Sequence, residues 1–445
     1  MHTWYEQAVF YHIYPLGLLG AEKTNTLTET AHRLTELESW IPHISDLNGS
    51  AIYIGPLFES CTHGYDTKDF RLVDRRLGSN EDFARFVRLC HENGIRVVVD
   101  GVFNHTGREF FAFQDIREKR EASPYKDWYR GVNFGWGSPL GDPFGYEAWQ
   151  GHFELPCLNL WNPEVRQYLF DSIQFWIDNF NIDGIRLDCA NVLDFGFMKE
   201  LREKTSAMKP DFWLMGEVIH GEYNRWVNPE MLHSVTNYEL HKALYSGHND
   251  HNYFEIAHNV RRLEAVGRSL YTFVDNHDED RIASKLNNLA NLFPVYQLLF
   301  TLPGIPSVYY GSEWGIEGKR SRTSDEVLRP ALNLSDMHGK APELASHIAA
   351  LGKIHTENDA FHNGSYKELL LTNHQYAFSR SGEHGTVISA VNNDEQPASI
   401  SIPLPCAASD VVSLLPREIP FSLENGRLSV TLPANGGAIF KLQEV

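Results

Sequence analysis

Short runs of aliphatic, β-branched and aromatic residues alternate with longer segments of helical periodicity along most of the chain. Between the runs, Ser79 and Asp82 resemble a capping box that opens a helix ending at Gly94, and Pro163 is placed as in a first helical turn. Repeated strand–helix units indicate a parallel sheet, and eight of them predict an α/β protein built on a (β/α)8 TIM barrel. The eight runs that we predict to be strands are residues 10–15, 51–57, 96–104, 184–189, 212–218, 235–240, 270–276 and 306–311.

Two segments depart from a bare barrel. Residues 106–158, between the third and fourth strands, are a long insertion rich in Gly, Trp and Tyr, and a connection of this length usually has a function. After about residue 367, short alternating strands with turn signals at 383–385 and 424–426 predict a C-terminal antiparallel β-sandwich domain over 367–445. We therefore expect the barrel to be formed by residues 1–105 and 159–360.

Composition narrows the classes of protein that remain. With 42% hydrophobic and 22% charged residues in 445, the chain is globular rather than disordered or fibrous. A net charge of −19 argues against nucleic-acid binding and favours a neutral, polyhydroxylated substrate. Five scattered cysteines, an N-terminus without a signal-peptide pattern, and an apolar stretch over 289–310 broken by prolines predict a cytoplasmic protein with no membrane partner.

The ends of the predicted strands carry the candidate chemistry, because TIM-barrel active sites lie at the carboxyl ends of the strands. One such acid alone is more often a solvated loop residue or a helix cap, but four strand ends together indicate a site. Without phosphate-loop or metal-ligand spacing, clustered carboxylates point to glycoside cleavage by one ionised and one protonated carboxyl. Arg186 lies on the same side of its strand as Asp188 and would hold Asp188 ionised. The negative charge of Asp188 would in turn raise the pKa of Glu217 and keep Glu217 protonated. The strand ends are Asp100 to His105, Arg186 with Asp188, Glu217, and Asp275 to Asp278.

These blocks resemble the four signature regions of the α-amylase family of glycoside hydrolases. Residues 63–67 and 155–159 resemble two further motifs of that family, and the resemblance covers about residues 6–360. It implies that Asp188 is the nucleophile, Glu217 the acid/base, and Asp278 a third carboxylate that binds and distorts the sugar. It also implies roles around that sugar: stacking by Tyr65, hydrogen bonding by His105 and His277, support of Arg186 by Asp100, and a structural role for Asn104.

Within the family, the chain is most similar to the cyclomaltodextrinase, neopullulanase and maltogenic amylase branch. His63, His220 and the Ala190-Asn191 pair carry this similarity. Asp325 and Arg329 match a pair that the branch uses for the sugar behind the cleaved one, and they also have the spacing of an i,i+4 surface salt bridge.

The chain also departs from this branch. The branch usually begins with an additional N-terminal β domain, which we expect to be absent because the first strand starts near Phe10. It usually has Glu where this chain has Val192 and Trp where it has Ile219, both on the leaving-group side.

The resemblance implies a retaining hydrolase of α-1,4-glucosidic bonds in maltooligosaccharides, cyclodextrins or related α-glucans. A 4-α-glucanotransferase on the same substrates is an alternative, and a non-catalytic sugar-binding relative is disfavoured because all three carboxylates are present. The expected partner is an α-glucan oligosaccharide; the sequence leaves the oligomeric state open, with a monomer as the expectation. We expect no required cofactor and no metal site. A structural calcium ion, which many family members bind through the asparagine equivalent to Asn104, is conceivable but not expected, because the insertion has no Asp-rich loop.

Overall fold

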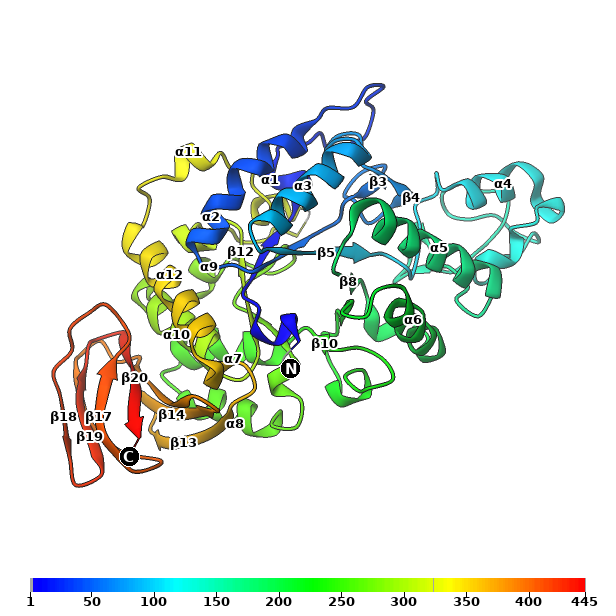
Figure 1. Ribbon diagram of the computed structural model, residues 1–445. Helices are drawn as coiled ribbons and strands as arrows, with labels where there is room; N and C mark the ends of the chain where they lie inside the picture. Colours follow the sequence, from blue (N-terminus) through cyan, green and yellow to red (C-terminus); the bar gives the residue numbers. More distant parts are fainter. Residues whose placement is uncertain (1–2, 323, 445) are drawn as a thin grey trace.

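The computed structural model describes residues 3–322 and 324–444. Eight parallel strands form one sheet in the order β10-β9-β8-β5-β2-β1-β12-β11, and a parallel bridge between Thr236 and Tyr271 closes it (Figure 1). The predicted TIM barrel is therefore confirmed. Its strands are β1 (Phe10–Ile13), β2 (Ala51–Ile54), β5 (Arg96–Gly101), β8 (Gly184–Leu187), β9 (Trp213–Gly216), β10 (Ser234–Val235), β11 (Tyr271–Phe273) and β12 (Ile305–Tyr309).

Helices surround this barrel, and two of them begin as the sequence predicts. Ser79 and Asp82 form the capping box of α3, and Asn162 caps α5 with Pro163 at its first position. The α-helices are α1 (Pro15–Leu18), α2 (Trp40–Asp46), α3 (Asn80–Glu92), α4 (Phe111–Lys119), α5 (Pro163–Phe180), α6 (Phe195–Met208), α7 (Tyr238–Asn249), α8 (Tyr253–Arg262), α9 (Ile282–Lys285), α10 (Leu292–Thr301), α11 (Leu334–Met337) and α12 (Pro342–Glu357). No helix in the described part of the chain is both long and apolar enough to cross a bilayer.

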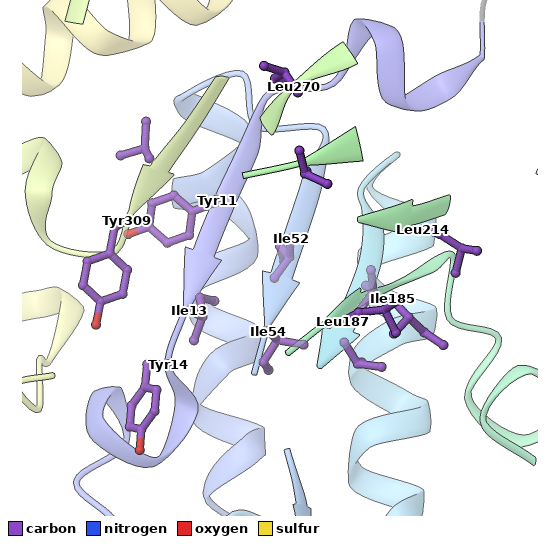
Figure 2. Packing of buried hydrophobic residues seen from close by; sticks show 14 of the residues in the cluster. Tyr11, Ile13, Tyr14, Ile52, Ile54, Ile185, Leu187, Leu214, Leu270 and Tyr309 are labelled. Carbon is purple, nitrogen blue, oxygen red and sulfur yellow. The ribbon is translucent and has the colours of Figure 1, made fainter. Parts of the chain in front are cut away.

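Side chains alternate between the two faces of each barrel strand, which positions the site. Outward residues of β1 and β2, such as Tyr11 and Ile52, belong to the large core shared with the helices (Figure 2). Inward residues near the strand starts, including Phe10 and Trp213, form a separate apolar cluster. Further along the strands, several inward positions carry polar side chains: His12, Tyr53, Asp100 and Arg186. The barrel is thus filled by apolar groups at one end and by titratable groups at the other.

One predicted strand is shorter than expected. The sequence indicates a strand over residues 235–240, but β10 ends at Val235, and Tyr238 and Leu240 belong to α7. The Asn237 side chain accepts a hydrogen bond from the Leu240 amide at 3.0 Å and so starts the helix. The apolar run continues from a strand into a buried helix, and hydrophobic periodicity does not distinguish these two elements when both are buried.

The insertion after β5 contains α4 and one small antiparallel hairpin, β6-β7. Its regular elements are η3 (Arg120–Ala122), η4 (Lys126–Trp128), β6 (Ala148–Trp149) and β7 (His152–Pro156). A separate hairpin after β2 consists of β3 (Phe58–Ser60) and β4 (Thr67–Val73). The other short 3-10 helices are η1 (Trp4–Gln7), η2 (Arg33–Ser39), η5 (Ala190–Val192), η6 (Tyr223–Arg225), η7 (Gly267–Ser269), η8 (Leu289–Asn291), η9 (Ser312–Trp314), η10 (Glu326–Leu328) and η11 (Asp359–Phe361).

The C-terminal domain is antiparallel, and it packs two sheets over a core of its own (Figure 1). The five-stranded sheet has the order β13-β14-β15-β20-β17, and the three-stranded sheet β16-β19-β18. Both predicted turns lie between paired strands, and the first strand begins at Ser365. The strands are β13 (Ser365–Leu371), β14 (Gln375–Gly382), β15 (Gly385–Asn392), β16 (Ala398–Pro403), β17 (Ala408–Ser413), β18 (Phe421–Glu424), β19 (Arg427–Leu432) and β20 (Gly436–Glu444).

Candidate active site

Arg186 binds three carboxylates at the carboxyl ends of β5, β8 and β9. Its Nη1 donates to Asp100 Oδ1 at 3.0 Å and to Asp188 Oδ1 at 2.8 Å, while Nη2 lies 2.8 Å from Glu217 Oε1. The guanidinium is 3% exposed, so its charge is balanced by these buried acids rather than by water. Gly55, at the end of β2, permits this packing, because a Cβ there would lie 2.3 Å from Asp100 Oδ2.

The buried acids differ from ordinary carboxyls in their proton affinity. Burial raises the pKa of Glu217 to about 7, and the nearby charges of Asp188 and Asp278 act in the same direction, while Arg186 opposes them. Burial also raises the pKa of Asp100 to about 6, again against the effect of Arg186. Glu217 is therefore able to hold a proton near neutral pH beside a second carboxylate.

The separation of Asp188 and Glu217 is short. One oxygen of each carboxylate and the Cys189 sulfur lie within 4.8 Å of one another. Retaining glycosidases have carboxyl groups about 5–5.5 Å apart, whereas inverting enzymes need roughly 6.5–9.5 Å to admit a water. The spacing fits the retaining class.

Two residues in this cluster were not identified from the sequence. Cys189 has a left-handed backbone (φ 50°), from which its N–H donates to Glu217 Oε2 at 3.1 Å and its thiol to Asp188 Oδ2 at 3.2 Å. Tyr238, at the start of α7, donates to Glu217 Oε1 at 3.4 Å and accepts from Asn276 Nδ2 at 3.2 Å. The position of Cys189 directly after Asp188 was the only available signal for the first, and the sequence gives no signal for the second.

Aromatic and imidazole side chains line the neighbouring wall. The Tyr65 hydroxyl lies 2.5 Å from His277 Nε2 and 3.2 Å from Asp100 Oδ2, and the Tyr65 and His277 rings are stacked. Burial lowers the pKa of His277 well below its ordinary value and also lowers that of His105, so both imidazoles are neutral at physiological pH. Asn104 is buried beside His105, with its amide nitrogen 3.2 Å from His105 Nδ1. The structure thus brings these four predicted residues next to the carboxylates.

Asp278 is linked to the loop that follows β12. Arg329 donates to Asp278 Oδ1 at 2.6 Å and to the His277 carbonyl at 2.9 Å, and it lies 3.6 Å from Asp325. The Asp325–Arg329 pair is therefore an i,i+4 ion pair, as one of the two interpretations of the sequence predicts. It is also more than a surface pair, because Arg329 is 15% exposed and contacts the third carboxylate.

The two remaining predicted histidines are exposed. His63 accepts a hydrogen bond from the Tyr65 amide at 3.2 Å, and its carbonyl accepts one from the Tyr14 hydroxyl. His220 has no hydrogen bond or ion pair with the carboxylate cluster in the part of the chain that the structure describes. Val192 and Ile219 follow Asp188 and Glu217 in the chain, and they are 51% and 41% exposed.

Two groups that a calcium site of the kind known in the family would use have protein partners in the structure. The buried acid of the insertion, Asp142, is bound by Arg108 and Arg117, and the Asn104 amide faces His105. In the described residues, the one group of three convergent metal-type ligands is Asp188, Cys189 and Glu217, within the carboxylate cluster itself. Calcium needs six to eight oxygens, which two carboxylates and a thiol do not supply by themselves.

Comparison with known proteins assigns the family. The alpha-amylase family profile, described as alpha amylase, catalytic domain, matches residues 25–359. The chain is 30% identical over 471 residues to a cyclomaltodextrinase of Geobacillus thermopakistaniensis, covering 99% of this chain and 78% of the relative. It is 31% identical over 288 residues to an intracellular maltogenic amylase of Bacillus subtilis, covering 63% and 48%. A cyclic alpha-maltosyl-(1→6)-maltose hydrolase from Arthrobacter globiformis superposes with a TM-score of 0.83 at 25% identity, over 99% of this chain and 100% of that one. This chain belongs to the alpha-amylase family of glycoside hydrolases.

Proposed function

We propose that this protein is a retaining hydrolase of α-1,4-glucosidic bonds in short linear and cyclic maltooligosaccharides. The observation that carries the proposal is the buried Arg186, which joins Asp188 and Glu217 with carboxylate oxygens within 4.8 Å. This arrangement supplies an ionised carboxylate and a protonated one at the spacing of double displacement.

In the first step, an Asp188 oxygen attacks the anomeric carbon while Glu217 gives its proton to the glycosidic oxygen. The bond to the leaving sugar breaks, and a glycosyl ester forms on Asp188. Arg186 and the Cys189 thiol each hold one oxygen of Asp188, so the carboxylate is oriented before substrate arrives.

In the second step, Glu217 has become ionised and removes a proton from water. The water oxygen attacks the same carbon, the ester bond breaks, and Asp188 leaves as a carboxylate. Glu217 is then protonated again. Its pKa of about 7 suits both roles, because it lies near the pH at which the group must first give and then take a proton.

The remaining groups are assigned to the sugar at the cleaved position. Asp278, held by Arg329, is proposed to bind sugar hydroxyls and to favour a flattened ring. The neutral imidazoles of His105 and His277 are able to donate or accept hydrogen bonds, and the Tyr65 ring offers an apolar face. His63 and Asp325, near this wall, are proposed to contact the preceding sugar, whereas His220 would act on the leaving-group side.

The substrate class rests on what the relatives are named for. One relative is named a cyclomaltodextrinase, and one solved neighbour is named a hydrolase of a cyclic maltosyl-maltose. We therefore propose better action on short maltooligosaccharides and β-cyclodextrin than on starch. A cytoplasmic location is proposed as well, supported by five free cysteines and by the relative named intracellular maltogenic amylase.

The test is a product profile on maltotriose, β-cyclodextrin, pullulan, isomaltose and starch. The proposal expects hydrolysis of maltotriose and β-cyclodextrin with a higher kcat/KM than that of starch. Products longer than the substrate at high maltotriose would indicate a glucanotransferase, in which a sugar hydroxyl replaces water. Cleavage of isomaltose alone, or a higher kcat/KM on starch, would contradict the proposal.

A further inference from the structure

Trp161 is the most exposed large apolar side chain of the described residues, at 76%. Single exposed apolar residues are ordinary, but this indole is held in place. Its Nε1 donates to Asp194 Oδ2 at 3.1 Å, and its backbone N–H donates to Asn159 Oδ1 at 3.2 Å. Asp194 is itself fixed, because its other oxygen accepts from Arg166 and from the Phe197 amide. The ring is thus oriented in solvent without being buried.

An open hollow of about 420 Å³ lies beside this ring, and its walls are polar. Asp127, Asn159, Asn162 and Glu164 line it together with two prolines. The Asp127 carboxylate has no hydrogen bond or ion pair within residues 3–322 and 324–444, and Glu164 uses one oxygen for the Trp128 indole. A fixed aromatic face next to free hydrogen-bond acceptors suits a sugar, which has an apolar face and hydroxyl edges. We call this feature the Trp161 hollow.

The Trp161 hollow lies at the catalytic end of the barrel. Trp161 directly precedes Asn162, the N-cap of α5, and its partner Asp194 is the N-cap of α6. Helices of the barrel begin at the carboxyl ends of the strands, so both residues lie at that end. Asp194 follows Asp188 by six residues, with the exposed Val192 between them. Trp161 is thus joined through Asp194 to the segment that follows Asp188.

The order of the strands in the barrel indicates the direction in which a bound sugar chain would run. Asp325 and Arg329 follow β12, whereas Asp194 follows β8. In the closed order β10-β9-β8-β5-β2-β1-β12-β11, these two strands are four steps apart either way, so their loops face each other across the barrel. A sugar chain that begins near Arg329 and crosses the carboxylates therefore leaves toward β8.

We propose that the Trp161 hollow binds the distal sugars on the leaving-group side of a linear maltooligosaccharide. The inference rests on the proposed function and names residues that favour longer linear substrates. Val192 and Ile219 follow Asp188 and Glu217 in the chain, and both side chains are exposed. Maltotriose is too short to use the hollow, and maltoheptaose is expected to reach it.

The experiment compares kcat/KM on maltotriose and maltoheptaose for the wild type, Trp161→Ala and Trp161→Phe. The matched control is Phe254→Ala, on an exposed aromatic (46%) of α8, a helix that packs on β13 of the C-terminal domain. Trp161→Ala should lower kcat/KM on maltoheptaose roughly five- to tenfold through KM, as expected for loss of one aromatic contact. Maltotriose kinetics and Tm should be unchanged, and Trp161→Phe should be intermediate, because it keeps a ring but loses the bond to Asp194.

A second measurement separates this inference from the proposed function. Calorimetry of maltoheptaose binding to Glu217→Gln, with and without Trp161→Ala, should show the same five- to tenfold weakening without any turnover. If the wild type hydrolyses neither sugar, the proposed function fails, while this binding comparison still decides the role of Trp161. Unchanged maltoheptaose KM and binding in Trp161→Ala, or an equal loss on maltotriose, would overturn the inference.

Discussion

Glu217 must carry a proton to protonate the departing oxygen, which makes the pH dependence of turnover a direct test of its role. A carboxyl with a pKa of about 7 is about nine-tenths protonated at pH 6, whereas one with the ordinary value of 4.5 would be only about 3% protonated. Burial therefore increases the active fraction about 30-fold at that pH. Since the protonated form is active, kcat/KM on maltotriose should fall about tenfold per pH unit above the pKa.

The perturbation is Glu217→Gln, which keeps an acceptor for Arg186 but has no proton to give. We expect kcat/KM on maltotriose to fall by about 100- to 10,000-fold and the alkaline decline to disappear. With α-maltosyl fluoride, whose fluoride departs without protonation, the loss should be much smaller. Asp188→Asn is the matched control, because removal of the nucleophile should impair both substrates alike.

Steady-state kinetics between pH 5 and 9 on both substrates are sufficient for this test. A wild-type profile with no decline above pH 7 would refute the assignment of the acid. Equal losses of Glu217→Gln on maltotriose and on the fluoride would do the same.

Four further outcomes follow from the site. Proton NMR of a fresh maltotriose hydrolysate should show the α-anomer first, because two displacements retain configuration; an initial β-anomer would contradict the mechanism. Asp278→Asn should reduce turnover severely with little change in Tm, since its contacts strengthen as the sugar flattens; near-normal turnover would remove it from the site. Glu217→Gln should raise Tm at pH 8 and change it little at pH 5, because a carboxyl whose pKa is about 7 folded and 4.5 unfolded costs about 3 kcal/mol of stability once both forms are ionised; a lower Tm at pH 8 would count against this. Dialysis against a chelator should leave activity and Tm unchanged, and a loss restored by calcium alone would show a metal site.

The barrel could be predicted because each of its strands is a short apolar run followed by polar residues. The period of two sends Tyr11 and Ile13 outward and His12 inward, so the carboxyl ends of the strands collect Asp100, Arg186 and their neighbours. The strand ends alone therefore predict where the candidate carboxylates lie. The extent of β10 was not predictable, because the cap formed by Asn237 turns an apolar run into a helix.

Contacts between side chains of neighbouring strands could not be predicted from the sequence. That Arg186 reaches Glu217 as well as Asp188 depends on the register of β8 against β9, which pairs Arg186 with Met215. The left-handed backbone of Cys189 is an uncommon conformation for a residue other than glycine, and it alone aims that N–H at Glu217. Trp161 lies in a segment where no periodicity indicates whether a side chain is buried.

The closure of the barrel has a thermal consequence. Between β10 and β11 a single backbone bridge, Thr236 to Tyr271, joins the sheet, and β10 has only two residues. At the catalytic end the same gap is spanned by side chains, from Asn276 through Tyr238 to Glu217. Local opening on warming would begin at this weakly bonded edge, and it would admit water to Glu217, whose raised pKa depends on burial. We therefore expect inactivation by heat to precede unfolding of the barrel. Glu217 would lose its proton while the rest of the sheet is still protected from amide exchange.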